Sequence, residues 1–189
     1  MSNRSPSPVI LDCTLRDGGY YNGWDFEESI VRHYLRALTA AGVKVVELGY
    51  RSLPGTDYMG ALGYCTDEYL SRLSLPDSLR VAVMVDAGSL LHAAEGPVAA
   101  IDALFLARSE SRIEIVRVAV HSAALRQCRS MLERLKEKGY FVTLNLMQIT
   151  TLDDDELRDC ATWLNDVGCV DVLYFADSLG KLTPTDIAP

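Results

Sequence analysis

The sequence has no long hydrophobic run and no stripe of basic residues. No apolar stretch approaches the roughly 18 residues that a membrane span requires, so we expect no membrane partner. The 26 acidic residues outnumber the 18 basic ones, for a net charge of -8, which argues against nucleic acid as the main partner. Residues 1–8 are polar and rich in Pro and Ser, and they lack the apolar core of a secretory signal.

Paired cysteines and the glycine motifs of nucleotide-binding proteins are missing as well. The number of cysteines is odd and no C-x-x-C pair occurs among Cys13, Cys65, Cys128, Cys160 and Cys169. Three of them fall in apolar patterns, so we interpret these as small core residues of a reduced, cytoplasmic protein. The first strand is followed neither by G-x-G-x-x-G nor by G-x-x-x-x-G-K-[ST], which counts against an open nucleotide-binding domain.

The sequence does contain one pattern six times, in which a short β-branched run precedes a polar loop and an amphipathic helix. The predicted strands are Val9–Cys13, Val43–Leu48, Arg80–Val85, Ile113–Val120, Phe141–Met147 and Asp171–Phe175. The predicted helices are Ser29–Ala41 (after a capping box of Asp25 and Glu28), Thr66–Leu73, Ser89–Arg108 (interrupted at Gly96-Pro97), Ala123–Lys138 and Asp153–Val167. This alternation predicts a parallel sheet with right-handed crossovers, either open or closed into a barrel.

The residues within the strands favour the barrel. In the fourth strand, valines at 116, 118 and 120 alternate with Arg117, Ala119 and His121, and in the fifth Thr143 and Asn145 alternate with leucines. Strands with one apolar face and one mixed face suit a barrel interior that carries chemistry. A complete eight-unit barrel takes about 250 residues, and Thr183-Pro184 resembles the start of a sixth helix. We therefore predict one α/β domain, residues 1–189, that comprises the first six β/α units of a TIM barrel without the last two.

The working residues of such a barrel lie at the carboxyl ends of its strands. Polar candidates at these ends are Thr14, Arg16, Asp17, Glu47, Tyr50, Arg51, Asp86, His121, Asn145, Gln148, Asp177 and Ser178. The strongest local signal is Arg16 beside Asp17, followed by two glycines. The carboxylate suits a hard divalent cation and the guanidinium suits an anionic oxygen. A surface ion pair in a glycine turn is the alternative, and the pattern alone does not decide between them.

The stretch from Asp12 to Gly18 resembles the D-x-T-L-R-D-G signature of the DRE-TIM metallolyases, which include 3-hydroxy-3-methylglutaryl-CoA lyase, isopropylmalate synthase and 4-hydroxy-2-oxovalerate aldolase. Four further segments resemble that superfamily in the same order, so the resemblance covers essentially the whole chain. They are residues 20–26 (YYNGWDF, as in an aldolase-domain branch), 45–51 (VVELGYR), 145–148 (NLMQ) and 176–180 (ADSLG).

The resemblance implies a role for each residue of the signature. Asp17 would be a metal ligand, Arg16 would stabilise the enolate oxygen that forms when a carbon–carbon bond is made or broken, and Glu47 would support Arg16 and the metal site. The metal, Mn²⁺ or Mg²⁺, would chelate a 2-oxo acid and act as a Lewis acid on its carbonyl. The expected activity is an aldolase or lyase reaction next to a 2-oxo acid of the pyruvate type, with an aldehyde as the second small molecule.

Two positions depart from the family pattern. The 4-hydroxy-2-oxovalerate aldolases have a basic His four residues after the Arg, where this chain has Tyr20, which we take as a catalytic candidate. The family also draws two metal ligands from an H-x-H on strand seven. This chain has only His33, His92 and His121 and no H-x-H.

The remaining candidates are substrate-binding residues, each with a structural alternative. They are His121, Asn145, Asp177, Ser178 and Arg51. Tyr20, Tyr21 and Trp24 form a lid over the site or pack the long first loop.

Alternative functions remain open at this stage. An acyl-CoA-condensing synthase is one, and a non-catalytic scaffold or binding subunit is another, because an unfinished barrel leaves strand edges that seek partners. We expect a homo-oligomer or a complementing C-terminal half.

Overall fold

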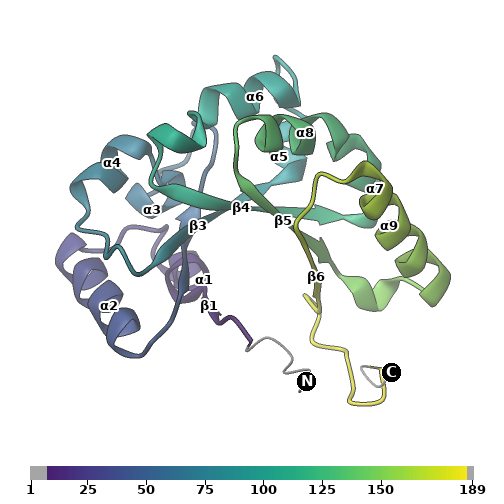
Figure 1. Ribbon diagram of the computed structural model, residues 1–189, viewed down its shortest axis with the longest axis horizontal. Helices are drawn as coiled ribbons and strands as arrows, with labels where there is room; N and C mark the ends of the chain where they lie inside the picture. The colour runs from purple at the N-terminus through teal and green to yellow at the C-terminus, as the bar shows by residue number, and fades with distance from the viewer. Residues whose placement is uncertain (1–7, 187–189) are drawn as a thin grey trace, which may run out of the picture. The chain divides into compact units, whose positions relative to one another are not determined.

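A computed structural model describes residues 8–186 as strands alternating with helices (Figure 1). The strands are β1 (Leu11–Asp12), β2 (Val45–Tyr50), β3 (Arg80–Asp86), β4 (Ile113–His121), β5 (Phe141–Met147) and β6 (Val172–Ala176). Their order in the sheet is the order of the chain, β1-β2-β3-β4-β5-β6. The pairs β1–β2, β4–β5 and β5–β6 are parallel. A doubly wound sheet reverses its strand order at a switch point, and this sheet does not.

The chain divides into two compact units, the first made of residues 1–51 and 55–83 and the second of residues 52–54 and 84–189. The first contains α1 (Thr14–Gly18), the 3₁₀ turn η1 (Gly19–Tyr21), α2 (Glu28–Ala40), α3 (Ala61–Tyr64) and α4 (Asp67–Arg72). The second contains α5 (Ala87–Leu91), α6 (Pro97–Leu104), η2 (Arg108–Glu110), α7 (Ser122–Leu125), η3 (Arg126–Cys128), α8 (Arg129–Glu137), η4 (Ile149–Thr151) and α9 (Asp154–Val167).

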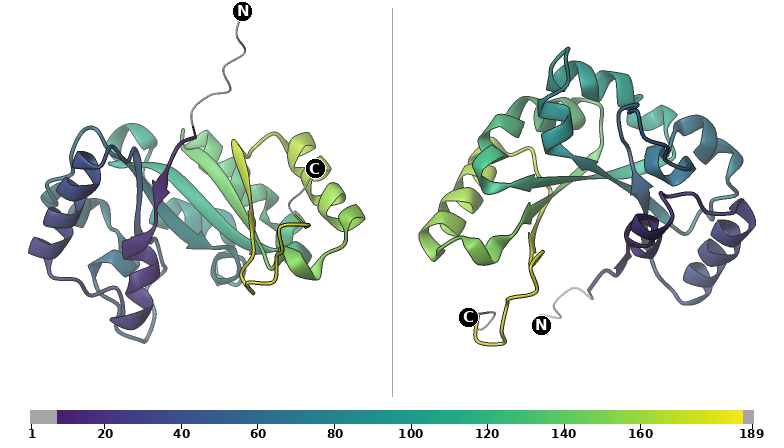
Figure 2. Two further views of the ribbon diagram at one scale, coloured as in Figure 1. Left: turned by 90° about the horizontal axis from the view of Figure 1, so that it is seen from below. Right: turned by 180° about the vertical axis from the view of Figure 1, so that it is seen from behind.

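Within the second unit, α8 and α9 lie on the same side of β4, β5 and β6 (Figures 1 and 2). Valines 116, 118 and 120 of β4 and the leucines 144 and 146 of β5 are buried, and so are Met131, Leu132 and Leu135 of α8. The alternate positions of these strands carry polar side chains that are also buried, among them Arg117 and Asn145. One apolar, helix-covered face and one mixed face is the arrangement predicted from the alternation of residues in these strands.

In the first unit the helix α2 buries a single stripe. Val31, Leu35 and Leu38 are spaced by four and three residues and are all buried, as expected for an amphipathic helix. The predicted capping box at its start is wrong. The helix begins at Glu28, so that Glu27 and not Asp25 occupies the N-cap position, and it has no side-chain cap. The Asp25 carboxylate accepts a hydrogen bond from the Tyr58 hydroxyl (3.0 Å).

Two other predicted helices are divided and one matches closely. The segment 89–108 separates into α5 and α6 at Gly96-Pro97, and the segment 123–138 separates into α7 and α8 at η3. The last predicted helix is α9, which has a capping box between Asp153 and Glu156 and ends at Gly168 in the left-handed region (φ +67°). The turn at the predicted start of a sixth helix is present, because Asp186 accepts hydrogen bonds from the Thr183 amide and hydroxyl. Residues 187–189 lie outside the described part of the chain.

The first strand is shorter than predicted, and this shifts the signature motif into a helix. Only Leu11 and Asp12 pair with β2. The Asp12 carboxylate accepts hydrogen bonds from the Thr14 amide (3.2 Å) and hydroxyl (3.0 Å) and from the Tyr34 hydroxyl (2.9 Å). These bonds turn the chain into α1 directly after β1. Arg16 and Asp17 therefore lie on a helical turn and not in an extended loop.

Three of the five cysteines are buried, namely Cys65, Cys128 and Cys160. No helix among residues 8–186 combines the length and the apolar character needed to cross a membrane.

Gly49 fixes the close packing of β2 against α3, and we expect Gly49→Ala to destabilise the protein strongly. A Cβ at position 49 would lie 1.9 Å from the Leu62 carbonyl oxygen and 2.8 Å from its carbonyl carbon. Because these are backbone atoms of a helix, relief requires α3 to move, at a cost of about 1–3 kcal/mol or more. The free energy of unfolding in urea measures this effect. Gly55→Ala is the control, since its Cβ would meet nothing within 4 Å, and equal stability of the two variants would contradict the account.

Candidate active site

The signature residues of the first unit form one connected cluster at the carboxyl end of β2. Glu47 is fully buried (0% exposed) within that strand. Its Oε1 accepts a hydrogen bond from Arg16 Nε over 2.8 Å. Arg16 Nη1 lies 2.6 Å from Asp17 Oδ1. One guanidinium therefore bridges a buried carboxylate and a carboxylate that is 55% exposed.

The cluster keeps Arg16 charged and oriented. Burial acts to lower the pKa of the Arg16 guanidinium, but the hydrogen bond and the charge of Glu47, together with Asp17, raise it above its ordinary value. The Arg16 side chain is only 15% exposed, so its position is fixed by these partners and not by solvent. A fixed, permanently charged guanidinium is suited to an anionic oxygen.

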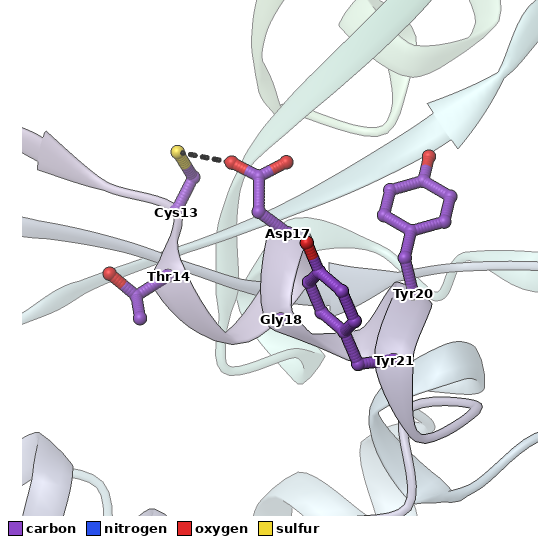
Figure 3. Close-up of a pocket in the computed structure, with 6 residues that line it drawn as sticks. All are labelled: Cys13, Thr14, Asp17, Gly18, Tyr20 and Tyr21. Carbon is purple, nitrogen blue, oxygen red and sulfur yellow. Dashed lines mark hydrogen bonds between the residues drawn. The ribbon is translucent and has the colours of Figure 1, made fainter.

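Asp17 lies in a pocket on the first unit (Figure 3). The pocket is lined by Cys13, Thr14, Asp17, Gly18, Tyr20 and Tyr21. Figure 3 shows the Cys13 thiol pointing at the Asp17 carboxylate, and Cys13 Sγ donates to Asp17 Oδ2 over 3.2 Å. Burial and this hydrogen bond raise the pKa of the Cys13 thiol, so it remains a protonated donor that orients Asp17.

Three aromatic rings stand beside the pocket. The Tyr20 and Tyr50 hydroxyl oxygens are 2.6 Å apart. Trp24 packs edge-to-face on both rings, with centroids 4.9 Å from Tyr20 and 5.3 Å from Tyr50. Its Nε1 donates to the Arg16 carbonyl oxygen (2.9 Å). Of the predicted alternatives for these aromatics, the structure shows Trp24 as packing of the first loop, whereas Tyr21 is 95% exposed.

The donor set around Asp17 fits part of a metal site. An exposed carboxylate is a suitable oxygen ligand for Mg²⁺ or Mn²⁺, and Mg²⁺ is commonly held by one or two carboxylates with water and substrate completing its shell. Among residues 8–186, no group of three or more His, Cys, Asp or Glu side chains has the arrangement of a metal site. Of the Asp17 and Glu47 carboxylates, Asp17 is the exposed one that lines the pocket, and Glu47 is buried against Arg16.

Arg51 belongs to a different cluster of the first unit. It is buried, and its guanidinium contacts the Cys65 carbonyl oxygen and lies 2.6 Å from Asp67 Oδ2. These contacts hold the start of α4 to the end of β2. The substrate-binding role predicted for Arg51 stays a prediction, and the observed contacts favour a role in holding the loop.

The second unit carries the other predicted substrate residues. Asn145 Oδ1 accepts a hydrogen bond from buried Arg117 (2.9 Å), and the Arg117 guanidinium stacks over the Tyr174 ring at 4.8 Å. The Thr143 hydroxyl, opposite Arg117 in the register of β4 and β5, is buried and has no hydrogen-bond partner among the described residues. A polar group of this kind inside a barrel-type fold is available to a ligand.

The remaining three predicted residues of this unit have different environments. His121 is exposed at the end of β4, directly before α7. Asp177 accepts hydrogen bonds from the Lys181 and Leu182 amides, and these bonds lower the pKa of its carboxyl. The Ser178 hydroxyl accepts a bond from the Gln148 amide (3.2 Å). Asp177 and Ser178 thus order the loop after β6, and substrate contact by any of the three stays a prediction.

Sequence reasoning included Tyr50 among the polar candidates at strand ends without giving it a role. It missed Arg117, which was noted only for the face of the fourth strand on which it lies. The usable signal for Arg117 was a charged residue in an otherwise valine-rich strand, since a buried Arg requires partners. No signal in the sequence pairs Tyr50 with Tyr20.

The sequential parallel strands, with helices on one side of them, are those of a β/α-barrel protein, and the charged cluster lies at the strand ends where such proteins carry their working residues. The chain belongs to the HMGL-like family, whose model matches residues 7–189. This confirms the resemblance and the barrel-type fold predicted from the sequence.

Individual relatives fall into the same group. An oxaloacetate decarboxylase of Mycobacterium tuberculosis is 26% identical over 182 residues, which are 95% of this chain and 50% of that protein. A 4-hydroxy-2-oxovalerate aldolase of Rhodococcus opacus is 31% identical over 177 residues, which are 93% of this chain and 48% of that protein. The chain thus spans about half the length of the curated relatives that it matches.

Solved structures show the same fold. The N-terminal domain of a proposed aldolase from Bacteroides vulgatus matches with a TM-score of 0.75 and 27% identity, over 95% of this chain and 57% of that one. The HMG-CoA lyase of Bacillus subtilis matches with a TM-score of 0.64 at 13% identity, over 95% and 61% of the two chains. At that identity the second likeness concerns the fold alone.

Proposed function

We propose that the protein is a divalent-metal-dependent aldolase or lyase that makes or breaks a carbon–carbon bond next to a 2-oxo acid. The observation that carries this proposal is the Glu47–Arg16–Asp17 cluster. It presents a fixed cation and an exposed carboxylate side by side at the end of a barrel strand. Family membership and the names of the relatives, an aldolase and a decarboxylase, support the same class of reaction.

The chemistry expected of Arg16 follows from its position. When a bond to the carbon beside a 2-oxo group breaks, its electron pair moves toward the carbonyl, and negative charge develops on that oxygen. A preorganised guanidinium stabilises such charge more than the neutral ground state, which lowers the barrier. Glu47 holds Arg16 in place over 2.8 Å without touching the reactants.

Asp17 is the residue that would hold the divalent cation, which we propose to be Mn²⁺ or Mg²⁺. Bound there, the cation would polarise the carbonyl of a 2-oxo acid as a Lewis acid. The Cys13 thiol donates to Asp17 Oδ2 and so fixes the direction in which the carboxylate faces the pocket. Further ligands would come from substrate, water or protein groups beyond the described residues.

The substrates we propose are a 2-oxo acid of the pyruvate type and an aldehyde. On the second unit, the polar group of Arg117, Thr143 and Asn145 offers buried donors of the kind that hold a substrate carboxylate or hydroxyl. Because the relatives are about twice as long, we also propose that the active form includes a complementing C-terminal segment or a further copy of the chain. The domain formed by residues 1–189 would then be a partial barrel.

Asp17→Asn is expected to weaken Mn²⁺ binding by at least about tenfold. The purified protein is titrated with Mn²⁺ by calorimetry, with and without oxalate, which mimics the enolate of pyruvate. We expect oxalate to tighten Mn²⁺ binding in the wild-type protein, and the variant to lose that gain because the amide is a poorer ligand than the carboxylate.

Asp57→Asn is the matched control, since Asp57 is an exposed carboxylate of the same unit outside the pocket. Equal Mn²⁺ affinities of wild type, Asp17→Asn and Asp57→Asn would rule out Asp17 as a ligand. The absence of any oxalate-dependent binding by a folded wild-type protein would count against the proposed function itself.

A further inference from the structure

The hydroxyl groups of Tyr20 and Tyr50 form the shortest contact between neutral side chains at the candidate site. Their oxygens are 2.6 Å apart, which is short for a hydrogen bond between two hydroxyls. Tyr50 ends β2, three residues after Glu47, and is half-buried, whereas Tyr20 is 63% exposed and lines the pocket that holds Asp17. The contact therefore joins the interior of the site to its opening.

Either hydroxyl can donate in the contact between Tyr20 and Tyr50. Tyr20 is the more exposed of the two and lines the pocket. When Tyr50 donates to the Tyr20 oxygen, the Tyr20 proton is therefore available to the pocket. Burial and the hydrogen bond with Tyr20 raise the pKa of the Tyr50 phenol, so Tyr50 remains protonated and able to donate at neutral pH.

The surrounding rings keep the two hydroxyls together. Trp24 packs edge-to-face on both tyrosines, and its Nε1 is tied to the Arg16 carbonyl. Gly19 leaves the space for this indole, since a Cβ there would lie 2.0 Å from Trp24 Cδ1. The tyrosine pair is thus anchored to the same residue, Arg16, that the proposed function places on the enolate oxygen.

We propose that Tyr20 is the catalytic acid and base of the site and that Tyr50 is the positioning residue that donates to it. This inference rests on the proposed function. In the direction of bond formation, the enolate carbon attacks the aldehyde carbon, and the electron pair of the aldehyde C=O bond moves to its oxygen. That oxygen takes the proton of Tyr20. The anionic Tyr20 oxygen is stabilised by the hydrogen bond from Tyr50 until water returns a proton to it. In bond cleavage, water first takes the proton of Tyr20, the anionic Tyr20 oxygen then takes the proton of the substrate hydroxyl as the carbon–carbon bond breaks, and the enolate that leaves takes a proton from water.

Two probe reactions separate this role from that of Arg16. Cleavage of 4-hydroxy-2-oxovalerate requires a hydroxyl proton to leave, whereas decarboxylation of oxaloacetate does not. Both reactions place negative charge on the 2-oxo oxygen. The acid and base pair therefore matters for the first reaction, and Arg16 matters for both.

The test measures both activities for Tyr20→Phe, Tyr50→Phe and the control Tyr58→Phe, whose hydroxyl is bonded to Asp25 away from the pocket. We expect Tyr20→Phe to lower kcat for aldol cleavage about 100-fold or more, and Tyr50→Phe to lower it about tenfold with KM unchanged. Both variants should keep decarboxylation within about threefold of wild type, and both should bind Mn²⁺ with oxalate as wild type does. The control should keep both activities.

A purely structural role for the tyrosine pair predicts a different outcome. Both activities would then fall together, or Mn²⁺ and oxalate binding would weaken, and either result overturns the proposal. Unchanged aldol cleavage in Tyr20→Phe overturns it as well. If the wild-type protein catalyses neither reaction even when its complementing C-terminal segment is supplied, the proposed function fails and the tyrosine pair fails with it. Failure of the proposed function can be distinguished from failure of the tyrosine proposal alone, because only in the second case is the wild-type protein active.

Discussion

Arg16→Gln is expected to lower kcat for both aldol cleavage and decarboxylation by about 10²–10³-fold, the usual loss when one donor to a developing oxyanion is removed. The neutral amide is close in length to part of the Arg side chain but carries no charge and cannot bridge two carboxylates. In the wild-type protein the guanidinium lies 2.8 Å from Glu47 and 2.6 Å from Asp17. Because the charge on the 2-oxo oxygen is common to both reactions, the two losses should be similar in size.

Steady-state kinetics with both substrates measures this effect. Arg126→Gln serves as control, since Arg126 is an exposed residue of the second unit paired with Asp159, and its removal should change neither rate. A variant at Arg16 that lost only one of the two activities would show that the guanidinium does not act on the shared oxygen.

Glu47→Ala is expected to reduce the free energy of unfolding by about 3–5 kcal/mol, the usual cost of removing one partner of a buried ion pair. The Glu47 side chain is 0% exposed and the Arg16 side chain is 15% exposed. Truncation therefore leaves a poorly solvated guanidinium together with a cavity in β2. Urea unfolding followed by circular dichroism measures the change.

Two companion variants separate charge from packing. Glu68→Ala removes an exposed carboxylate whose pair with Arg72 is long, at 3.9 Å, so its cost should be about 0–1 kcal/mol. The double variant Glu47→Ala with Arg16→Ala completes a double-mutant cycle, and its loss should be smaller than the sum of the two single losses because no buried charge is left unpaired. Additive losses would mean that the Glu47–Arg16 contact contributes little to stability.

Much of the fold could be predicted from the sequence because its periodic signals are local. The six strand cores were located from β-branched runs, and α9 was located almost to the residue from the amphipathic segment between Thr151 and Gly168, although its capping box at Asp153 was not predicted. The start of α2 was predicted to within one residue, but its capping box was not found, and the Asp25 carboxylate bonds instead to Tyr58, a residue 33 positions away in the chain. Local patterns do not contain such competition between distant partners.

In the candidate site, too, the local features could be predicted from the sequence and the contacts between distant residues could not. The side-by-side placement of Arg16 and Asp17 and the contact with Glu47 followed from the signature motif. The hydrogen bond between the Tyr20 and Tyr50 hydroxyls could not be predicted from that motif. Neither could the ion pair of Arg51 with Asp67. Both are contacts between side chains from separate segments of the chain, and a single sequence does not show which segments come into contact after folding.

Because β1 is short, the signature motif lies in the helix α1, and the helix geometry sets the direction of each of its side chains. Because the chain becomes helical directly after Asp12, neighbouring side chains of α1 are separated by about 100° around the helix axis. This angle turns Arg16 toward Glu47 while Asp17 faces the pocket. Inserting or deleting one residue between Asp12 and Arg16 would rotate both side chains by that angle, so that Arg16 no longer faces Glu47 and Asp17 no longer faces the pocket. The number of residues in this segment therefore decides which partners Arg16 and Asp17 meet.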